Sequence, residues 1–278
     1  LQALPWGRVA TSNLLFTRPG ARPQWILMAH RDSKSQLVPT LVRVGAVFLG
    51  VAGWIALVVL AALWISGPPM TFPAGVWVAA VAVMAAGVVL GLSWAGNASP
   101  GALDNATGLA ALLAVASREP DSGEVAFLLT DAEELGLVGA REVVGQLPAV
   151  QGVINVDGLA DEGTLFITEG AGPRRTGSAP QLVAALLTAG SALEVPVQRK
   201  RLPRALQVDH LPLVEAGLPA VTLLRGDWST LMRVHRPADD VSGLRATGAA
   251  DGATLLSAAV RLLRESSTHL AGGRRPGP

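Results

Sequence analysis

The sequence predicts an α/β domain with a mixed, mostly parallel β-sheet, interrupted by a hairpin of two apolar helices. Short apolar runs alternate with segments of helical periodicity, which is the rhythm of helices covering a largely parallel sheet. Two further segments carry no charge and are long enough to cross a bilayer. Acidic and histidine side chains stand directly after several of the apolar runs. The 278 residues provide ample material for a core.

The predicted strands are the short apolar runs, and the predicted helices are the segments with apolar residues at a 3.6-residue period. The strands are residues 13–17, 25–29, 125–130, 152–156, 164–168, 195–198 and 220–224. The helices outside the hairpin are residues 105–117, 135–144, 179–189, 210–216 and 242–264. We therefore expect a discontinuous domain formed by residues 1–40 and 95–270, followed by a disordered tail at 271–278.

The interrupting segments, residues 44–65 and 74–94, each match the about 20 residues that span a hydrocarbon core. A helical hairpin buried in a soluble core is the alternative, but soluble helices carry a polar stripe and these segments are apolar on every face. We expect residues 41–94 to form a transmembrane hairpin in the lipid bilayer. Arg31, Lys34 and Arg43 precede the first span, so the positive-inside rule predicts a cytoplasmic globular part.

Composition excludes several kinds of site. The formal net charge of +1 gives no basic footprint for nucleic acid, so none is expected as a partner. The chain has no cysteine, which excludes disulfides, thiolate metal sites and a cysteine nucleophile. Any metal must therefore be held by His, Asp or Glu.

Candidate metal ligands stand where predicted strands end. His30 follows one strand, Glu133 and Glu134 follow another, and Asp157 closes a third. Open α/β sheets bind ligands at the carboxyl ends of their strands, and zinc is the commonest ion with mixed oxygen and nitrogen ligands. With Asp104 before a predicted helix, these residues predict a metallohydrolase.

Simpler interpretations exist for three of these features. Asp104 is equally typical of a helix N-cap, and the adjacent Glu133 and Glu134 are favoured at a helix start by the macrodipole. The Asp209-His210 pair also fits a helix-start cap as well as it fits a functional role. Asp32, two residues after His30, is close enough to fix the tautomer of that imidazole.

The residues as a set resemble the M28 family of zinc aminopeptidases. The matching pieces, in chain order, are HRDS at 30–33, GALDNATG at 101–108, EELGL at 133–137 with Gly139, NVD at 155–157, DHLP at 209–212 before GLP at 217–219, and HRPAD at 235–239. The resemblance implies a three-layer zinc-exopeptidase-like domain, two zinc ions, and hydrolysis of N-terminal residues of peptides through a metal-activated water. The hairpin is an insertion relative to soluble relatives, although the family has membrane-embedded members.

The resemblance also assigns roles to residues. It implies the following ligands: His30 and Asp157 for one zinc, Glu134 and His235 for the other, and Asp104 as the bridge. Glu133 would be the general base, and Asp32 and Asp239 would orient His30 and His235. Val234 stands where many relatives have a tyrosine that stabilises the oxyanion, so another group must serve here.

Two other functions remain open. A single-zinc acyl transferase resembling glutaminyl cyclase would share the fold and the run from His30 to Lys34. A non-catalytic membrane protein that keeps the fold tends to lose ligands or the base, whereas all the predicted ones are present here. The sequence leaves the oligomeric state open.

Overall fold

A computed structural model of the chain describes residues 10–67, 74–118, 123–170, 179–203 and 206–272. These residues form two compact units. The first comprises Leu1–Ser33, Gly101–Asp227 and Asp239–Pro278, and the second comprises Lys34–Pro100 and Trp228–Ala238.

The first unit is built on a seven-stranded sheet with the order β1-β5-β2-β6-β9-β7-β8. Its strands are β1 (Leu14–Phe16), β2 (Trp25–His30), β5 (Val125–Thr130), β6 (Gly152–Leu159), β7 (Thr164–Thr168), β8 (Val197–Arg199) and β9 (Ala220–Gly226). The four central strands β5, β2, β6 and β9 are parallel, whereas β1 pairs antiparallel with β5 and β7 antiparallel with β9. The predicted mixed, mostly parallel sheet is confirmed.

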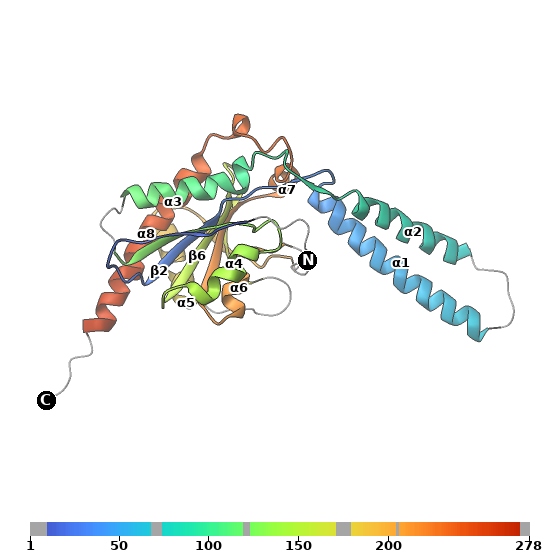
Figure 1. Cartoon of the computed structure of the whole chain (residues 1–278), viewed down its shortest axis with the longest axis horizontal. Coiled ribbons are helices and arrows are strands. Elements are labelled where there is room, and N and C mark those ends of the chain that lie inside the picture. The colour runs from blue at the N-terminus through green and yellow to red at the C-terminus, as the bar shows by residue number, and fades with distance from the viewer. Residues whose placement is uncertain (1–9, 68–73, 119–122, 171–178, 204–205, 273–278) are drawn as a thin grey trace. The chain divides into compact units, whose positions relative to one another are not determined.

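Helices cover both faces of this sheet, which makes three layers (Figure 1). The helices are α3 (Thr107–Arg118), α4 (Val138–Val143), α5 (Pro180–Ala192), α6 (His210–Glu215) and α8 (Thr247–Gly272). Successive β2 side chains alternate between the faces, because Trp25 and Leu27 join the core under α3, α5 and α8 while Ile26 and Met28 join the core under α4 and α6. Short helical turns are Ala102–Ala106, Val144–Gln146 and Val241–Gly243.

Several helices begin later than the sequence predicted. The helix expected from residue 135 starts at Val138, because Gly136 and Leu137 have positive φ values of 97° and 61° that no α-helix contains. The helix expected from residue 242 starts at Thr247. It runs to Gly272, so the first two residues of the predicted disordered tail are helical and the others lie outside the described residues.

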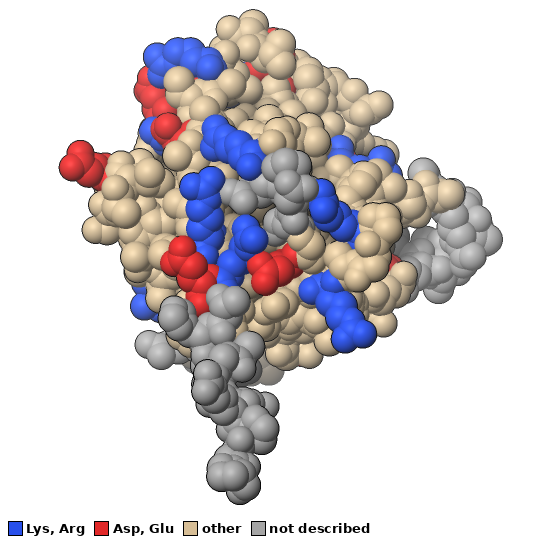
Figure 2. All heavy atoms as spheres, turned by 90° about the vertical axis from the view of Figure 1, so that its left-hand side faces the viewer, with Lys and Arg blue, Asp and Glu red and all other residues tan. Residues whose placement is uncertain are grey.

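The second unit contains the hairpin. Helices α1 (Thr40–Ser66) and α2 (Ala74–Gly91) pack against each other, and the strands β3 (Ser35–Gln36) and β4 (Ala95–Gly96) form an antiparallel ribbon at the hairpin base. The unit also includes α7 (Trp228–Arg233), which the sequence did not predict and which contacts α1. Acidic and basic side chains are interspersed on the face of the molecule shown in Figure 2.

Both hairpin helices are long and apolar enough to cross a membrane, with 27 and 18 residues. A core helix of a soluble protein is mostly buried, but only 11% of the most apolar stretch of each helix is buried here. The buried positions are small: Ala46 and Gly53 on α1, and Ala79 and Ala86 on α2. The two helices therefore pack through small residues and leave their large apolar side chains exposed.

Gly53 is the glycine of the hairpin with the least room for a side chain. A Cβ atom at Gly53 would lie 2.9 Å from Val83 Cγ2 and 3.2 Å from the Ala79 carbonyl oxygen, whereas one at Gly87 would meet nothing within 4 Å. We expect Gly53→Leu to destabilise the hairpin by about 1–3 kcal/mol through overpacking, and Gly87→Leu to be neutral. Thermal unfolding of both variants in detergent measures this. Equal unfolding midpoints would contradict the packing described here.

Candidate metal centre

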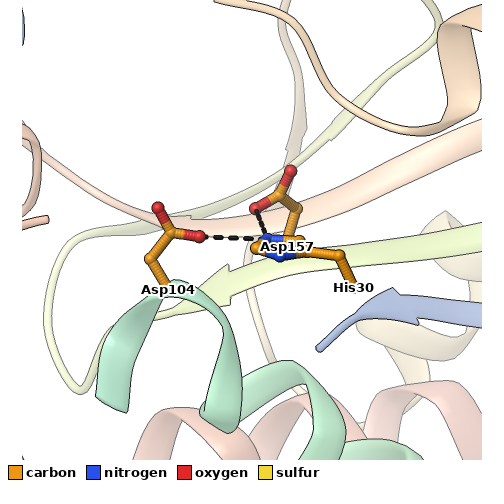
Figure 3. Close-up of side chains that lie close together, drawn as sticks. All are labelled: His30, Asp104 and Asp157. Carbon is orange, nitrogen blue, oxygen red and sulfur yellow. Dashed lines mark hydrogen bonds and ion pairs between the residues drawn. The ribbon is translucent and has the colours of Figure 1, made fainter. Parts of the chain in front are cut away.

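Two adjacent parallel strands place the first pair of predicted ligands. His30 is the last residue of β2, and Asp157 lies near the end of β6, which pairs in parallel with β2. The carboxyl ends of parallel strands meet at one edge of a sheet, so these side chains converge. His30 Nε2 lies 3.5 Å from Asp157 Oδ1, and the imidazole is fully buried (Figure 3).

Asp104 reaches the same imidazole from a helical turn rather than from a strand. The turn Ala102–Ala106 begins after Gly101, whose φ of 66° favours glycine. Asp104 Oδ1 lies 3.1 Å from His30 Nε2, and the ligand atoms of His30, Asp104 and Asp157 all lie within 4.8 Å of one another (Figure 3). The structure therefore gathers these three predicted ligands into one cluster.

The capping interpretation of Asp104 is not what the structure shows, because the neighbouring Asn105 makes those contacts. Asn105 Oδ1 accepts hydrogen bonds from the main-chain N–H groups of Gly108 and Gly158, and its amide donates to the Val156 carbonyl oxygen. Asn105 thus ties the start of α3 to the end of β6. The Asp104 carboxylate points at His30.

Glu133 and Glu134 follow β5 on an irregular turn. Ala132 has a φ of 56°, and the chain packs so closely here that a Cβ atom at Gly139 would lie 2.0 Å from the Asp131 carbonyl oxygen. A carboxylate oxygen of Glu134 lies within 4.8 Å of one of Asp104. Glu133 is 9% exposed. The adjacent acids therefore occupy different positions, as two different roles require.

Asp32 holds this turn in place. Its two carboxylate oxygens accept hydrogen bonds from the main-chain N–H groups of Glu133 and Glu134, each at 3.1 Å. The predicted contact with His30 is made mainly by the main chain, since His30 Nδ1 lies 3.1 Å from the Asp32 carbonyl oxygen and 3.6 Å from its carboxylate. A proton on Nδ1 donated to that carbonyl leaves Nε2 free for a metal.

Asp239 holds the Asp104 turn in the same way. It is fully buried, and its carboxylate accepts hydrogen bonds from the N–H groups of Leu103 at 2.7 Å and Asp104 at 3.2 Å. His235 follows α7 in the second unit, with a φ of 63°, and its carbonyl oxygen accepts a hydrogen bond from the Gln36 N–H. Metal ligation by His235, and its orientation by Asp239, remain predictions.

The buried charges favour a cation at this cluster. Burial lowers the pKa of His30, but the carboxylates of Asp104, Asp157 and Asp32 outweigh this effect and raise its pKa well above the usual value. Burial, with the nearby charge of Asp157, raises the pKa of Glu133 well above its usual range, and burial also raises the pKa of Asp157. Several carboxylates thus share a largely buried site in which positive charge would compensate them.

A second buried polar cluster lies beside the end of β5 and the interior of β6 and β9, and the sequence did not predict that its members meet. Asp209 accepts a hydrogen bond from the Thr130 hydroxyl, and His210 Nδ1 lies 2.6 Å from the Thr222 hydroxyl, which accepts from Asn155. Asp209 makes no capping hydrogen bond, so the capping interpretation is wrong. Burial raises the pKa of Asp209 to about 6 and lowers that of His210 to about 4. The available signal was a buried polar residue at the end of β5 and one inside each of β6 and β9.

Solved structures with the same fold include peptidases and cyclases. A zinc aminopeptidase from Bacillus subtilis, BSAP, matches with a TM-score of 0.57 and 18% identity over 89% of this chain and 48% of its own. The LapA aminopeptidase of Legionella pneumophila matches with a TM-score of 0.55 and 16% identity over 91% of this chain and 58% of its own. The glutaminyl cyclase of Porphyromonas gingivalis matches with a TM-score of 0.55 and 17% identity over 91% of this chain and 76% of its own.

The chain spans about half the length of the two aminopeptidases. No curated protein sequence matches it. The sequence pattern of peptidase family M28 matches residues 85–260, which is more than half of the chain and includes the turns that carry Asp104, Glu133, Glu134, Asp157 and His235. With the sheet, the ligand cluster and this match in agreement, the chain belongs to peptidase family M28.

Proposed function

We propose that the chain is a membrane-anchored aminopeptidase that uses two zinc ions to hydrolyse N-terminal residues of peptides. The observation that carries the proposal is the cluster of the buried His30 with the half-buried Asp104 and Asp157, with Glu133 and Glu134 on the adjoining turn. Oxygen and nitrogen donors of this kind, gathered within 4.8 Å, fit zinc. The family membership makes peptide hydrolysis the first reaction to test.

We assign the ligands as the sequence predicted. His30 and Asp157 would hold one zinc, Glu134 and His235 the other, and the two oxygens of Asp104 would serve both. The short separation of the Asp104 and Glu134 carboxylates supports this division. When bound, zinc polarises a carbonyl group and lowers the pKa of water toward neutrality.

Glu133 is suited to move the proton. Its raised pKa, caused by burial and neighbouring carboxylates, makes it a better proton acceptor at neutral pH than an ordinary glutamate. We assign to its carboxylate the removal of a proton from water and its delivery to the leaving amine. Asp32 fixes the positions of Glu133 and Glu134 by accepting hydrogen bonds from their main-chain N–H groups.

We propose that α1 and α2 cross the bilayer and anchor the enzyme, with the globular part in the cytoplasm. The exposure of their apolar side chains supports insertion, and the basic residues before the first span support the orientation. The predicted division into a peptidase domain, residues 1–40 and 95–270, and an anchor, residues 41–94, belongs to this proposal.

A glutaminyl-cyclase-like acyl transferase is the second candidate. The cyclase from Porphyromonas gingivalis is matched over 76% of its length, a larger share than in the aminopeptidases above. The two activities are separated by assaying purified protein with aminoacyl chromogenic amides and with N-terminal glutaminyl peptides, together with zinc analysis. Hydrolysis with two zinc ions per chain supports the peptidase, and cyclisation with one supports the alternative.

The first expected outcome concerns the base. Glu133→Gln should lower amide hydrolysis by about 10²–10⁴-fold, because the amide cannot accept the proton, while the zinc content stays that of the parent. Glu162→Gln, at an exposed glutamate on the same unit, is the matched control and should be fully active. A Glu133→Gln protein as active as the parent would refute the assignment of the base and favour a different reaction.

The second expected outcome concerns Asp32. Asp32→Ala frees the turn that carries Glu133 and Glu134, so zinc affinity should fall by about 10–100-fold, as measured by competition with a chelating dye. Asp161→Ala is the control, since Asp161 also accepts main-chain N–H groups, those of Arg245 and Gly248, but lies outside the cluster. Both variants should lose stability, and only Asp32→Ala should lose zinc affinity. An equal zinc affinity in both would contradict this role.

The third expected outcome concerns pH. The pKa of Asp209 is about 6 in the folded chain, above the ordinary value of about 3.9, so ionisation costs the folded state stability as pH rises between these values. In zinc-free protein, Asp209→Asn should therefore be more stable than the parent above pH 6, on the order of 2 kcal/mol, and the gain should vanish near pH 4.

Asp161→Asn is the control for this measurement because its shift has the opposite sign. Burial raises the Asp161 pKa, but hydrogen bonds from Arg245, Gly248 and Thr247 outweigh it and lower the pKa. Denaturant unfolding across pH should show this variant less stable than the parent at neutral pH, with the difference lost in acid. A pH-independent effect of Asp209→Asn would contradict the assigned pKa.

A further inference from the structure

The unit that contains the hairpin carries positive charge only. Its ranges, Lys34–Pro100 and Trp228–Ala238, contain Lys34, Arg43, Arg233 and Arg236 and no Asp or Glu. Taking these four from the 22 Lys and Arg of the chain leaves 18 against all 21 Asp and Glu in the first unit. Basic and acidic side chains are interspersed on the face shown in Figure 2. The unit with the apolar helices therefore has a net positive charge, whereas the first unit has a net negative one.

These charges gather at one end of the hairpin. Lys34 and Arg43 flank the β3 strand and the start of α1, and Arg233 and Arg236 lie at and after the end of α7, which contacts α1. The sequence that connects α1 to α2 at the other end carries no charge. The hairpin thus has one basic end and one neutral end.

Exposed apolar side chains occupy the same basic end. The β3–β4 register pairs Ser35 with Gly96 and Gln36 with Ala95, and Leu37 directly follows this pairing in the chain while Trp94 directly precedes it. Leu37 is 72% exposed and Trp94 is 76% exposed. Large apolar side chains at such exposure are what a membrane interface accommodates, with aromatic rings at the level of the headgroups.

Helix α7 extends this surface. Trp228 and Met232 are four residues apart, so they lie on one side of the helix, and they are 70% and 40% exposed. The segment after α7 is fastened to the ribbon, because the His235 carbonyl oxygen accepts a hydrogen bond of 2.7 Å from the Gln36 N–H. Helix α7 and the ribbon therefore belong to one surface around the hairpin base.

We propose that this surface, the basic collar, binds the headgroups of anionic phospholipids at the bilayer surface. The collar consists of Lys34, Leu37, Arg43, Trp94, Trp228, Met232, Arg233 and Arg236. Its apolar side chains enter the interface while its cations meet lipid phosphates, and the unit itself contributes no carboxylate that would repel anionic lipid. The inference rests on the proposed insertion of the hairpin and is independent of the catalytic assignment.

The collar has a consequence for the predicted ligand His235. The residue lies between Arg233 and Arg236 and is bonded to the ribbon through its main chain. Lipid bound at the collar would therefore order the segment that presents His235.

The test uses the full chain in lipid nanodiscs. The chain has no cysteine, so Met232→Cys provides a unique site for an environment-sensitive fluorophore. We expect headgroup-attached quenchers to reduce its emission roughly twofold more in phosphatidylcholine containing phosphatidylglycerol than in phosphatidylcholine alone. Leu113→Cys, labelled on the exposed face of α3 in the first unit, should show no lipid dependence. Equal quenching of the Met232→Cys label in the two lipid mixtures overturns the proposal.

Two charge variants test whether the effect is local. Arg43→Gln combined with Arg236→Gln should abolish the lipid dependence at position 232. Lys200→Gln combined with Arg201→Gln removes the same charge from the first unit and should leave the lipid dependence at position 232 intact. If both double variants lost the lipid dependence of quenching, net charge would explain the effect, and the proposed lipid binding by the collar would be overturned.

A third label separates failure of the collar from failure of the anchor. A label at Val58→Cys, at an exposed position within α1, reports hairpin insertion through quenchers placed deep in the bilayer. Quenching at 58 without lipid-dependent quenching at 232 overturns the collar and leaves the anchor standing. A label at 58 that no lipid quencher reaches overturns the anchor, and the collar with it. Neither outcome bears on peptide hydrolysis.

Discussion

The structure of the first unit depends on the burial of negative charge around one imidazole. Asp104 and Asp157 both approach His30 Nε2, and Glu133 and Glu134 stand on the next turn. Such a group of acids is costly to bury unless positive charge compensates it. The raised pKa of His30 is one expression of that demand, and a bound cation would meet it more fully. The parallel pairing of β2 with β5 and β6 imposes the arrangement.

The two irregular turns that carry acids are held by the same device. Asp32 accepts hydrogen bonds from two consecutive N–H groups of the glutamate turn, and Asp239 does so for the turn of Asp104. Because Asp32 and Asp239 bond to main-chain N–H groups, they fix the positions of the acidic residues and leave the carboxylates of those residues available. These hydrogen bonds make the geometry of the site a property of the fold rather than of a bound metal alone.

The division of the chain into units links the hairpin to a predicted metal ligand. The segment of His235, far along the sequence from the hairpin, belongs to the hairpin's unit and is bonded to the ribbon at its base. The apolar hairpin and a predicted metal ligand thus share one compact body. If the hairpin crosses a bilayer as proposed, this arrangement offers a route by which the bilayer would act on the segment of His235.

The sequence by itself determined the sheet type, the hairpin and the approximate ends of most strands, because apolar periodicity and uncharged length are local properties. Residue types also identified His30, Asp104 and Asp157 as candidates, and strand ends explained why His30 and Asp157 should meet. Only the tertiary structure decided which groups touch. Asn105 accepts from Gly158, Asp32 accepts from Glu133 and Asp209 accepts from Thr130. Each of these contacts joins residues far apart in the chain. No local pattern encodes contacts of that range, because they form only when the sheet brings its strand ends together.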